Sequence, residues 1–447
     1  MSTRRSFIQL GSAGFLASSR SWSANNSVGV GVIGLGGRGK DHIQEFLKRP
    51  DAQIRALCDV DQAAGEKAVA MVEKSSGRKP KLYSDMRALF DDKSIDVVSM
   101  ATPNHWHALG TIWATQAGKD VYIEKPASHN IFESRAMIAA AAKYRRIVQV
   151  GLQSRSIPLK QRAVELLGQG AIGRVYLAKG LCYKRRKSIG HKPDSPTPPG
   201  VDWSTFLGPA PMRPFNELRF KYNWHWFWDT GNGDIGNNGV HQMDVARWGL
   251  GVGMPNHVVS TGGKYVYEDD QETPNMQIAT FNYGDKELVL EVRGLPTGGE
   301  AGMQNGWGNL SATVFYGADG YMSVDDSVVR VYVGEKLELK VEEKGNVEGA
   351  LPHIANFLEA VRSRNDAGLA SPIAEGAAST NLCHLANISY RVGRALKLNS
   401  SGEIVDDGDA QKLMTRRYRE PFVISAAVEN GHHTQQAEKI KELQRNF

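Results

Sequence analysis

The chain has 447 residues, 41% of them hydrophobic and 23% charged, and its formal net charge at pH 7 is +6. A chain of this length and composition is expected to form two globular domains. Its lysines and arginines are scattered, so we expect no nucleic-acid partner; the one dense basic run, residues 184–187, is either a solvated loop or a phosphate-binding patch. Cys58, Cys182 and Cys383 lack the spacing of metal ligands, so we expect no metal site.

Residues 1–24 are expected to form a signal peptide that is no part of the fold. Arg4 and Arg5 precede a mildly apolar stretch from Ile8 to Leu16, and small residues follow. Paired arginines in this position are typical of the twin-arginine export route, although a basic, disordered tail is the alternative. The apolar stretch is too short to cross a bilayer and no later segment approaches that length, so we expect a periplasmic protein without a membrane span.

The stretch VGVGVIGLGGRG follows, in which a buried strand ends in Gly34-x-Gly36-x-x-Gly39 and an amphipathic helix begins. This order is the fingerprint of a dinucleotide-binding fold. The first glycine makes the tight turn, the second lets a pyrophosphate approach the backbone, and the third lets the helix pack closely. Gly37 and Arg38 lie in the same loop, where the helix N-terminus would face the phosphates. A glycine-rich turn in another kind of α/β protein is the alternative.

A second apolar strand, residues 53–58, ends at Asp59. A carboxylate at this place accepts hydrogen bonds from the adenosine ribose and repels a 2′-phosphate, so we expect NAD as the cofactor. Asp61 could take this role if the strand ends later. NADP stays possible, because Arg38 could stack on adenine or hold a 2′-phosphate.

Up to about residue 150, strands and helices alternate, which predicts a Rossmann domain with a doubly wound parallel sheet at residues 25–150. The strands are expected at residues 28–34, 53–58, 95–101, 120–124 and 146–151. Later strands follow one another directly and predict an α/β domain with an open, mostly antiparallel sheet at residues 151–425. Residues 426–447 read as a charged, helix-prone tail.

Two polar motifs follow predicted strands of the first domain. Thr102, Pro103, Asn104 and His107 come after the third strand. Ligands of open α/β sheets bind at the carboxyl ends of strands, so we expect Asn104 and His107 to face the nicotinamide half of the cofactor. A helix cap with surface histidines is the alternative.

The second motif is Glu124-Lys125-Pro126, at the end of the fourth strand. A lysine held there by a proline would project into the cleft. Beside an oxidised, positively charged nicotinamide its pKa should fall toward the range useful for proton transfer. Taken alone, the tripeptide is only a turn.

These motifs together resemble the Gfo/Idh/MocA family, named after glucose–fructose oxidoreductase and inositol dehydrogenase. Residues 233–244, on a helix of the second domain, and residues 416–422 near the carboxyl end add to the resemblance, which covers nearly all of the mature chain. It implies a Rossmann domain beside an open-faced sheet domain, NAD(P), and oxidation or reduction of a sugar or cyclitol carbinol. It also implies a homodimer or homotetramer formed through the open face of the sheet.

The resemblance gives roles to several residues. Lys125 corresponds to the lysine that contacts the reacting hydroxyl, and His241 corresponds to a catalytic histidine in an Asp-x-x-x-His pattern. Here Asn237 stands where that pattern has aspartate; an amide can orient an imidazole but brings no charge. Asp234 and Asp244 would share a helix face with His241, and either could supply the charge. A satisfied core histidine is the alternative for His241.

An aromatic segment at residues 222–229, which includes Trp226, could stack on a sugar or fill a domain interface. Arg155 and Tyr183 follow strand ends and are further candidates for the cleft. The expected substrate-binding residues are Arg155, Tyr183, Trp226, Asp234 and His241.

Three functions fit these features. The first is a sugar dehydrogenase or sugar–sugar oxidoreductase, which Lys125 favours. The second is an NAD-dependent redox glycoside hydrolase, which oxidises a sugar, eliminates the aglycone, adds water and reduces again. The third is a sugar-binding relative without turnover, which only Asn237 supports. Because the periplasm offers no recycling nicotinamide pool, an exported enzyme would need to hold its cofactor tightly.

Overall fold

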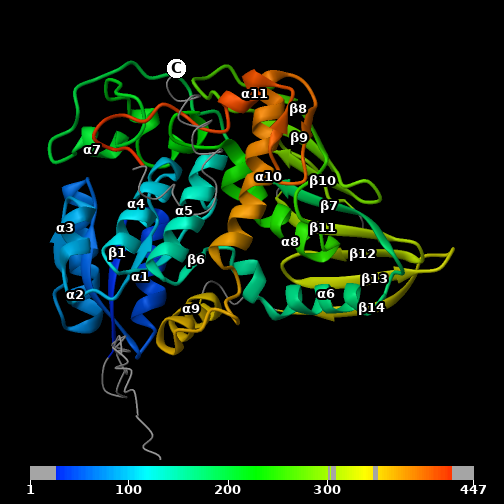
Figure 1. The fold of residues 1–447 in the computed structure, drawn as a ribbon, viewed down its shortest axis with the longest axis horizontal. Coiled ribbons are helices and arrows are strands. Elements are labelled where there is room, and N and C mark those ends of the chain that lie inside the picture. The colour runs from blue at the N-terminus through cyan, green and yellow to red at the C-terminus, as the bar shows by residue number, and fades with distance from the viewer. Residues whose placement is uncertain (1–26, 301–302, 304–308, 346–350, 425–447) are drawn as a thin grey trace, which may run out of the picture.

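The computed structural model describes residues 27–300, 303, 309–345 and 351–424. The expected signal peptide (residues 1–24) and tail (residues 426–447) lie outside the described residues. Two sheets lie side by side and are joined by helices (Figure 1). This arrangement confirms the predicted fold class. None of the described helices combines the length and the apolar character that a bilayer crossing requires.

The first sheet is parallel and has six strands in the order β3-β2-β1-β4-β5-β6. Every residue of β1 is buried, which explains its unbroken apolar run. The sequence did not predict β3, because it has only three residues and two of them are exposed. The strands are β1 (Val28–Ile33), β2 (Ala52–Cys58), β3 (Lys81–Tyr83), β4 (Val97–Met100), β5 (Asp120–Ile123) and β6 (Val148–Val150). The helices between them are α1 (Gly37–Leu47), α2 (Gln62–Ser76), α3 (Met86–Asp91), α4 (Asn104–Gln116) and α5 (Ile131–Tyr144).

The second sheet has ten strands in the order β14-β13-β12-β11-β7-β10-β9-β8-β15-β16. Only the pairing of β7 with β10 is parallel. The strands are β7 (Val175–Tyr183), β8 (His257–Gly263), β9 (Met276–Asn282), β10 (Glu287–Arg293), β11 (Leu310–Gly317), β12 (Gly320–Val324), β13 (Val328–Val333), β14 (Glu338–Lys344), β15 (Leu396–Leu398) and β16 (Ile404–Val405). The sequence did not predict β14, because its residues are all exposed or half-buried and give no apolar alternation.

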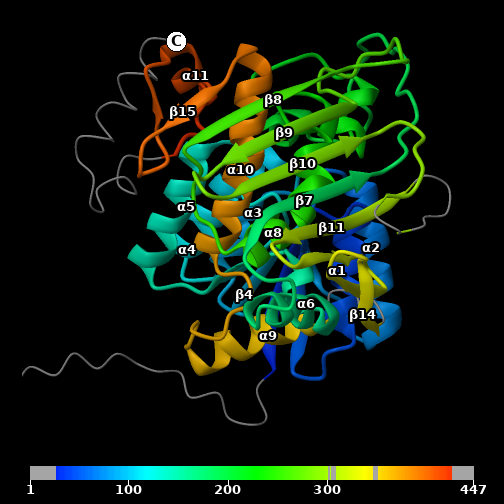
Figure 2. The same cartoon turned by 90° about the vertical axis from the view of Figure 1, so that its right-hand side faces the viewer.

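Helices α8 (Val240–Leu250) and α10 (Ile373–Val392) lie against one face of this sheet, and Figure 2 shows the opposite face of its central strands. Helix α10 also contacts α5, so it connects the two halves of the molecule. Helix α9 (Leu351–Ser363), although late in the chain, buries Ile354 and Phe357 against the parallel sheet, in one cluster with Val28 and Val30. Helix α6 (Pro158–Gly168) packs between α8 and β13, and a 3₁₀ turn, η1 (Gln153–Ser156), leads into it.

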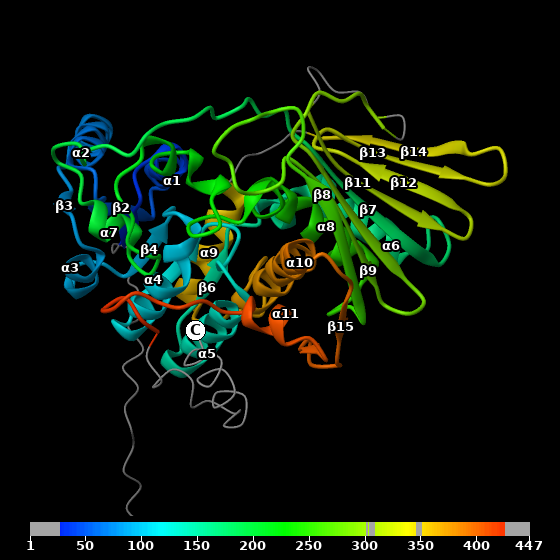
Figure 3. The same cartoon turned by 90° about the horizontal axis from the view of Figure 1, so that it is seen from above.

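After β7 the chain leaves the second sheet and crosses to the edge of the first domain before it returns to α8 (Figure 3). This crossing carries α7 (Trp203–Leu207) and the 3₁₀ turns η2 (Glu217–Arg219) and η3 (Asn223–Trp226). We call residues 198–224 the strap. The last described segment follows α11 (Gly408–Lys412) and runs back toward α7.

Candidate nucleotide and substrate site

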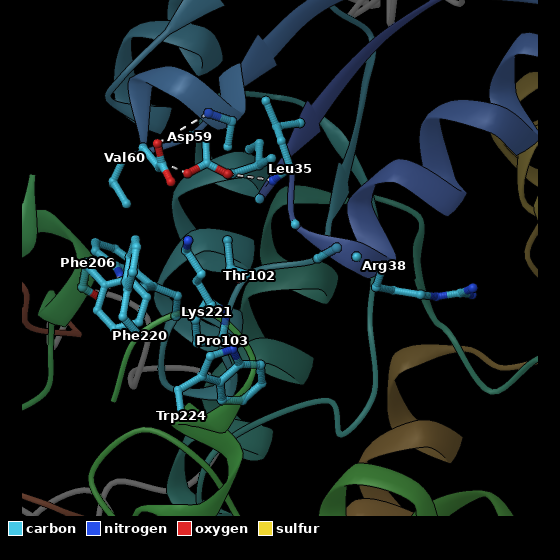
Figure 4. Close-up of a pocket in the computed structure, with 18 of the residues that line it drawn as sticks. Leu35, Arg38, Asp59, Val60, Thr102, Pro103, Phe206, Phe220, Lys221 and Trp224 are labelled. Carbon is cyan, nitrogen blue, oxygen red and sulfur yellow. Dashed lines mark hydrogen bonds between the residues drawn. The ribbon is translucent and has the colours of Figure 1, made fainter. Parts of the chain in front are cut away.

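A cleft of about 710 Å³ lies at the carboxyl ends of β1, β2, β4 and β5, between the parallel sheet and the strap. Figure 4 shows its lining. The sequence-predicted residues that line it are Gly34, Gly36, Gly37, Arg38, Asp59, Thr102, Pro103, Asn104, Glu124, Lys125 and Asn237. The second domain adds Thr205, Phe206, Phe220 and Lys221, which no sequence motif indicated, and Tyr222, Trp224 and His225 from the predicted aromatic segment.

The glycine loop has the geometry that its sequence predicts. Gly34 has a φ of +80°, and a Cβ there would come within 2.7 Å of the Ala101 carbonyl oxygen. A Cβ on Gly39 would overlap the Gly34 carbonyl, so Gly39 packs the helix and does not face the cleft. Gly36 and Gly37 meet no atom within 4 Å of a Cβ position. Because α1 begins here without a side-chain cap, its first N–H groups are available to a phosphate, and the loop fits a pyrophosphate.

Asp59 lines the cleft directly after β2. Its carboxylate accepts hydrogen bonds from the Leu35 amide (2.6 Å) and the Asp61 amide (2.9 Å), drawn as dashed lines in Figure 4. Burial raises the pKa of this carboxyl group. The Asp61 carboxylate instead caps α2 through the amides of Ala63 and Ala64 (3.0 and 3.2 Å). Asp59 therefore suits the ribose contact better than Asp61.

Arg38 extends away from Asp59 (Figure 4). Its guanidinium group forms an ion pair with Glu124. Its Nε donates to Glu124 Oε1 at 2.7 Å, and the same oxygen lies 3.0 Å from His42 Nε2 and 3.2 Å from Gln153 Nε2. Burial acts to raise the pKa of Glu124, but the Arg38 guanidinium and the His42 hydrogen bond outweigh it and hold that pKa well below its usual range. The alternative role of Arg38, on adenine or a 2′-phosphate, does not match this placement.

Lys125 follows Glu124 at the end of β5 and lines the same cleft. Its Nζ lies 3.9 Å from Glu124 Oε2, and most of its side chain is buried. Burial lowers the pKa of this ammonium group, while the Glu124 carboxylate opposes that effect. The side chain is therefore a cation that can give up a proton more readily than an exposed lysine.

Of the motif after β4, Thr102 and Asn104 line the cleft, whereas His107 lies outside it. The Thr102 hydroxyl is buried at the cleft without a hydrogen-bond partner among the described residues, so a cofactor could use it. Asn104 lines the cleft and donates to Asn232 Oδ1 at 2.9 Å. His107 faces elsewhere: its ring nitrogens bind the carbonyl oxygens of Pro126 (2.7 Å) and Thr102 (2.8 Å). The expected contact of His107 with a cofactor is thus replaced by a link between two strand-end loops.

His241 begins the first turn of α8, directly after a π-helical turn, η4 (Ile235–Gly239). Burial and, second to it, the Lys125 ammonium lower the pKa of His241 to about 3. His241 Nδ1 is buried and has no hydrogen-bond partner among the described residues. The imidazole is therefore neutral at neutral pH and lies close enough to Lys125 to feel its charge.

Asn237 does not orient His241, contrary to the sequence expectation. A π-helix closes i→i+5 hydrogen bonds, so residues four apart no longer stack on one face. The Asn237 amide nitrogen instead donates to Tyr222 Oη (3.2 Å) and Asp234 Oδ1 (3.5 Å). The position that departs from the family pattern is thus turned toward the cleft, which Asn237 lines.

Asp234 and Asp244, the two aspartates that could supply charge to His241, each bind an arginine. Asp234 binds the Arg186 guanidinium through both oxygens (2.7 and 2.9 Å). Asp244 is fully buried and binds Arg155 through both oxygens (2.8 and 2.9 Å). Arg155 is consequently committed to an internal ion pair and does not line the cleft.

The two aromatic substrate candidates also lie away from the cleft. Tyr183 belongs to a cluster on the other face of the second sheet, where its hydroxyl donates to Glu291 (3.1 Å) and Glu300. Side chains of a strand alternate between faces, and the neighbouring Cys182 is the one that faces α8. Trp226 is only 3% exposed and packs against the Arg186 guanidinium. Within the aromatic segment, Tyr222, Trp224 and His225 line the cleft.

Comparison with known protein families identifies both domains. Residues 28–152 match a family described as "Oxidoreductase family, NAD-binding Rossmann fold", and residues 166–283 match its C-terminal alpha/beta domain. The chain belongs to the Gfo/Idh/MocA oxidoreductase family. This result agrees with the resemblance seen in the sequence motifs and with the two-sheet fold.

Relatives of this family member include enzymes of two kinds. Levoglucosan dehydrogenase of Pseudarthrobacter phenanthrenivorans is 30% identical over 240 residues, which is 53% of this chain and 54% of that protein. An alpha-N-acetylgalactosaminidase of Shewanella oneidensis is 32% identical over 120 residues, which is 26% of each chain. The chain thus aligns with about half the length of the first relative and about a quarter of the second.

Solved structures share the fold at lower identity. A levoglucosan dehydrogenase in complex with NADH and levoglucosan superposes with a TM-score of 0.64 at 19% identity, covering 83% of this chain and 99% of that one. An oxidoreductase domain protein from Kribbella flavida gives a TM-score of 0.64 at 18% identity, covering 84% and 100%. At these identities the likeness concerns the fold alone.

Proposed function

We propose that this oxidoreductase moves a hydride between a hydroxyl-bearing carbon of a sugar or cyclitol and a bound NAD. The observation that carries the proposal is Lys125, a largely buried ammonium group that lines the cleft at the end of β5. His241, from the second domain, is not among the residues that line the cleft, but the Lys125 charge lowers its pKa, which indicates that the two groups are near one another. A cation and a neutral imidazole are the groups that a carbinol oxygen needs when it loses its proton.

The residues of the cleft fit a dinucleotide. The glycine loop and the start of α1 would hold the pyrophosphate, Asp59 the adenosine ribose, and the unpartnered Thr102 hydroxyl a further polar group. When bound there, the nicotinamide supplies the hydride acceptor or donor. Asp59 supports NAD over NADP, because a carboxylate repels a 2′-phosphate.

The protein's own groups handle the proton. In this proposal the neutral His241 ring accepts the hydroxyl proton at Nε2, because Nδ1 is buried. Lys125 Nζ donates a hydrogen bond to the same oxygen and stabilises its negative charge as the proton leaves. In the reverse direction, the same two groups return the proton to the forming alcohol.

A sugar or cyclitol is the substrate class that the cleft supports. Tyr222 and Trp224 line it beside Asn237, so that ring faces and an amide lie together. Apolar faces of sugars stack on aromatic rings, and their hydroxyls pair with neighbouring polar groups. The similarity to a relative named levoglucosan dehydrogenase agrees with this substrate class.

A redox glycoside hydrolase is the second candidate. The Shewanella oneidensis relative, named alpha-N-acetylgalactosaminidase, supports it over the 120 residues that align. In such a reaction the oxidised sugar loses its aglycone by elimination, adds water and is reduced again. Net NADH is then zero, which separates the two candidates by experiment.

The test has two parts. The purified protein is denatured and its released nucleotide is identified by chromatography; NAD(H) is expected, and NADP(H) would contradict the role of Asp59. The intact protein is then screened against sugars and aryl glycosides. Reduction of bound nicotinamide without aglycone release supports the dehydrogenase, aglycone release without net reduction supports the hydrolase, and neither signal with any sugar that binds would contradict both.

Export and assembly are further parts of the proposal. Paired Arg4 and Arg5 support twin-arginine export to the periplasm, and replacing both by lysine should leave the protein in the cytoplasmic fraction. The open face of the second sheet supports a homodimer or homotetramer, which light scattering would distinguish from a monomer. A periplasmic signal that survives the arginine replacement would argue against this route.

A further inference from the structure

The strap joins the first domain where the adenosine end of the cleft begins. The Asp202 amide donates to the Val60 carbonyl, and the Gln62 amide donates to the Gly200 carbonyl, both at 2.9 Å. These bonds form a short antiparallel bridge between Asp61 and Val201. The bridge begins two residues after Asp59, so the strap is attached beside the proposed ribose site.

An aromatic cluster lies beneath this bridge. Trp203, Phe206, Phe215 and Phe220 are buried against one another, with Val60 packed at their edge. Phe206 and Phe220 also line the cleft, and Figure 4 shows their rings on the side opposite Leu35 and the glycine loop. The second wall of the cleft is therefore apolar and belongs to the strap.

Helix α4 anchors the strap from the Rossmann side. Trp106 Nε1 donates to the carbonyl oxygens of Thr205 and Phe206, each at 3.0 Å. His105 Nε2 lies 2.8 Å from the same Phe206 oxygen. His105 and Trp106 belong to the same motif as Thr102 and Asn104, which line the cleft. The start of α4 therefore both lines the cleft and holds the strap.

The C-terminal segment anchors the strap from outside. The Arg419 guanidinium donates to the carbonyl oxygens of Gly208 (2.9 Å) and Ser204 (2.6 Å). Its backbone amide donates to Pro209, and Phe422 packs edge-on against Trp106. In Figure 3 this last segment runs back from α11 to α7. Arg419 thus fastens the strap without touching the cleft.

We propose that the strap is a second, separate part of the dinucleotide site and keeps the adenosine half of the cofactor captive. Lys221 is its charged contact: it lines the cleft, and Figure 4 shows its ammonium group directed toward Asp59. An ammonium group there can donate hydrogen bonds to the adenosine ribose hydroxyls, while Phe206 and Phe220 cover the apolar adenine. The inference rests on the proposed use of NAD.

The hydrogen bonds that attach the strap are what would retain the bound NAD. The bridge at Val60 and Gln62, the two hydrogen bonds from Trp106 and those from Arg419 must yield before the adenosine end opens. A cofactor held in this way is not exchanged in each turnover. Its hydride must then be returned in the same cleft, to a second carbonyl compound or to the substrate from which it came.

The experiment measures how fast bound nucleotide is exchanged. Holoenzyme is mixed with an excess of isotopically labelled NAD, and the labelled fraction is followed by mass spectrometry after rapid desalting. Arg419→Ala removes the outer anchor and should speed exchange about tenfold or more, because the hydrogen bonds of a charged group to the strap are lost. Arg417→Ala is the matched control, because Arg417 lies on the same segment and is exposed.

Lys221→Ala tests the second wall directly and leaves the fold intact, because Lys221 is an exposed residue. This substitution should speed the exchange of bound NAD and weaken the binding of NAD to protein from which the nucleotide has been removed. If wild-type protein exchanges within seconds, or if both variants exchange at the wild-type rate, the strap does not hold the cofactor. A protein that carries and rebinds no NAD at all would instead contradict the proposed function, so the two failures are distinguishable.

Discussion

The two halves of the cleft differ in how their residues are held together. The nucleotide half is built from short stretches at the ends of neighbouring parallel strands, where backbone geometry decides what each residue faces. The half contributed by the second domain, which includes the proposed substrate site, gathers residues from the strap and from a π-helical turn. There, hydrogen bonds between residues of different segments decide the side-chain directions, as between Asn237 and Tyr222.

Loss of the two proposed proton-transfer groups is the largest effect that we expect. Lys125→Met and His241→Ala should each reduce turnover about 10²–10⁴-fold, the usual contribution of general acid–base groups. Bound NAD should remain, since neither residue belongs to the glycine loop or contacts Asp59. Single-turnover hydride transfer and nucleotide content are measured on the same preparation.

His384→Gln is the matched control for His241→Ala. His384 is another buried imidazole whose pKa burial lowers to about 3, but it does not line the cleft and its Nε2 lies 3.1 Å from Ser128 Oγ. We expect a far smaller loss of turnover from it. Near-normal hydride transfer in both Lys125→Met and His241→Ala would remove these two residues from the mechanism.

The variant Asp244→Ala tests whether Asp244 stabilises the fold. Asp244→Ala would leave the buried Arg155 guanidinium without its main partner, and such breaks cost about 3–5 kcal/mol of unfolding free energy. Glu375→Gln is the control, because Glu375 joins the same network but is nearly half exposed. Urea unfolding of both variants gives the comparison. A stable Asp244→Ala protein with an altered pH–rate profile would instead favour the original expectation that Asp244 acts on His241.

The nucleotide half could be predicted because its sequence signals follow from backbone geometry. Gly34 needs a positive φ and Gly39 a close approach to the strand, and few residues other than glycine permit either. Asp59 was found from the end of one buried strand. The fold class followed from the alternation of strands and helices, which does not depend on individual contacts.

The half contributed by the second domain could not be predicted, because its outcome depends on backbone irregularity and on distant partners. The π turn at Ile235–Gly239 rotates Asn237 away from His241, and no periodicity in the sequence reveals it. Tyr183 was misplaced because one residue along a strand changes the face. Lys221 could not be predicted because it belongs to no recognisable motif, and the strap that brings it to the cleft has no regular hydrophobic pattern.

The free energy of unfolding at low pH should depend on three buried histidines. Burial lowers the pKa values of His105, His225 and His384 to about 3, whereas unfolding returns each to its ordinary range. Between about pH 6.5 and pH 3 the unfolded chain therefore binds more protons, and stability falls as the pH falls. Each histidine contributes up to about 1.4 kcal/mol per pH unit in this window.

This slope is measured by urea unfolding at several pH values. His384→Gln removes one titrating group far from the cleft and should flatten the pH dependence by about one proton. A wild-type stability that is constant from pH 6.5 to pH 4 would show that these histidines are charged in the folded protein, and would also undermine the neutral state proposed for His241.

Asn237→Asp gives the smallest effect and the sharpest test of the half contributed by the second domain. If Asn237 oriented His241, a carboxylate there would raise the His241 pKa and move the acidic limb of the pH–rate profile to higher pH. The structure turns Asn237 toward Tyr222 and Asp234, so we expect the limb to move by less than about one pH unit. The introduced carboxylate should instead be repelled by Asp234 and cost a little stability.

Lys125→Met is the matched comparison for this shift, because the Lys125 ammonium is the largest influence after burial that lowers the His241 pKa. Its removal should raise that pKa, which can be followed by NMR titration of His241 in a protein that no longer turns over. A larger upward shift from Asn237→Asp than from Lys125→Met would mean that residue 237 reaches the imidazole. The π turn would then be misassigned, and the family's Asp-x-x-x-His geometry would hold in this chain with an amide in place of the carboxylate.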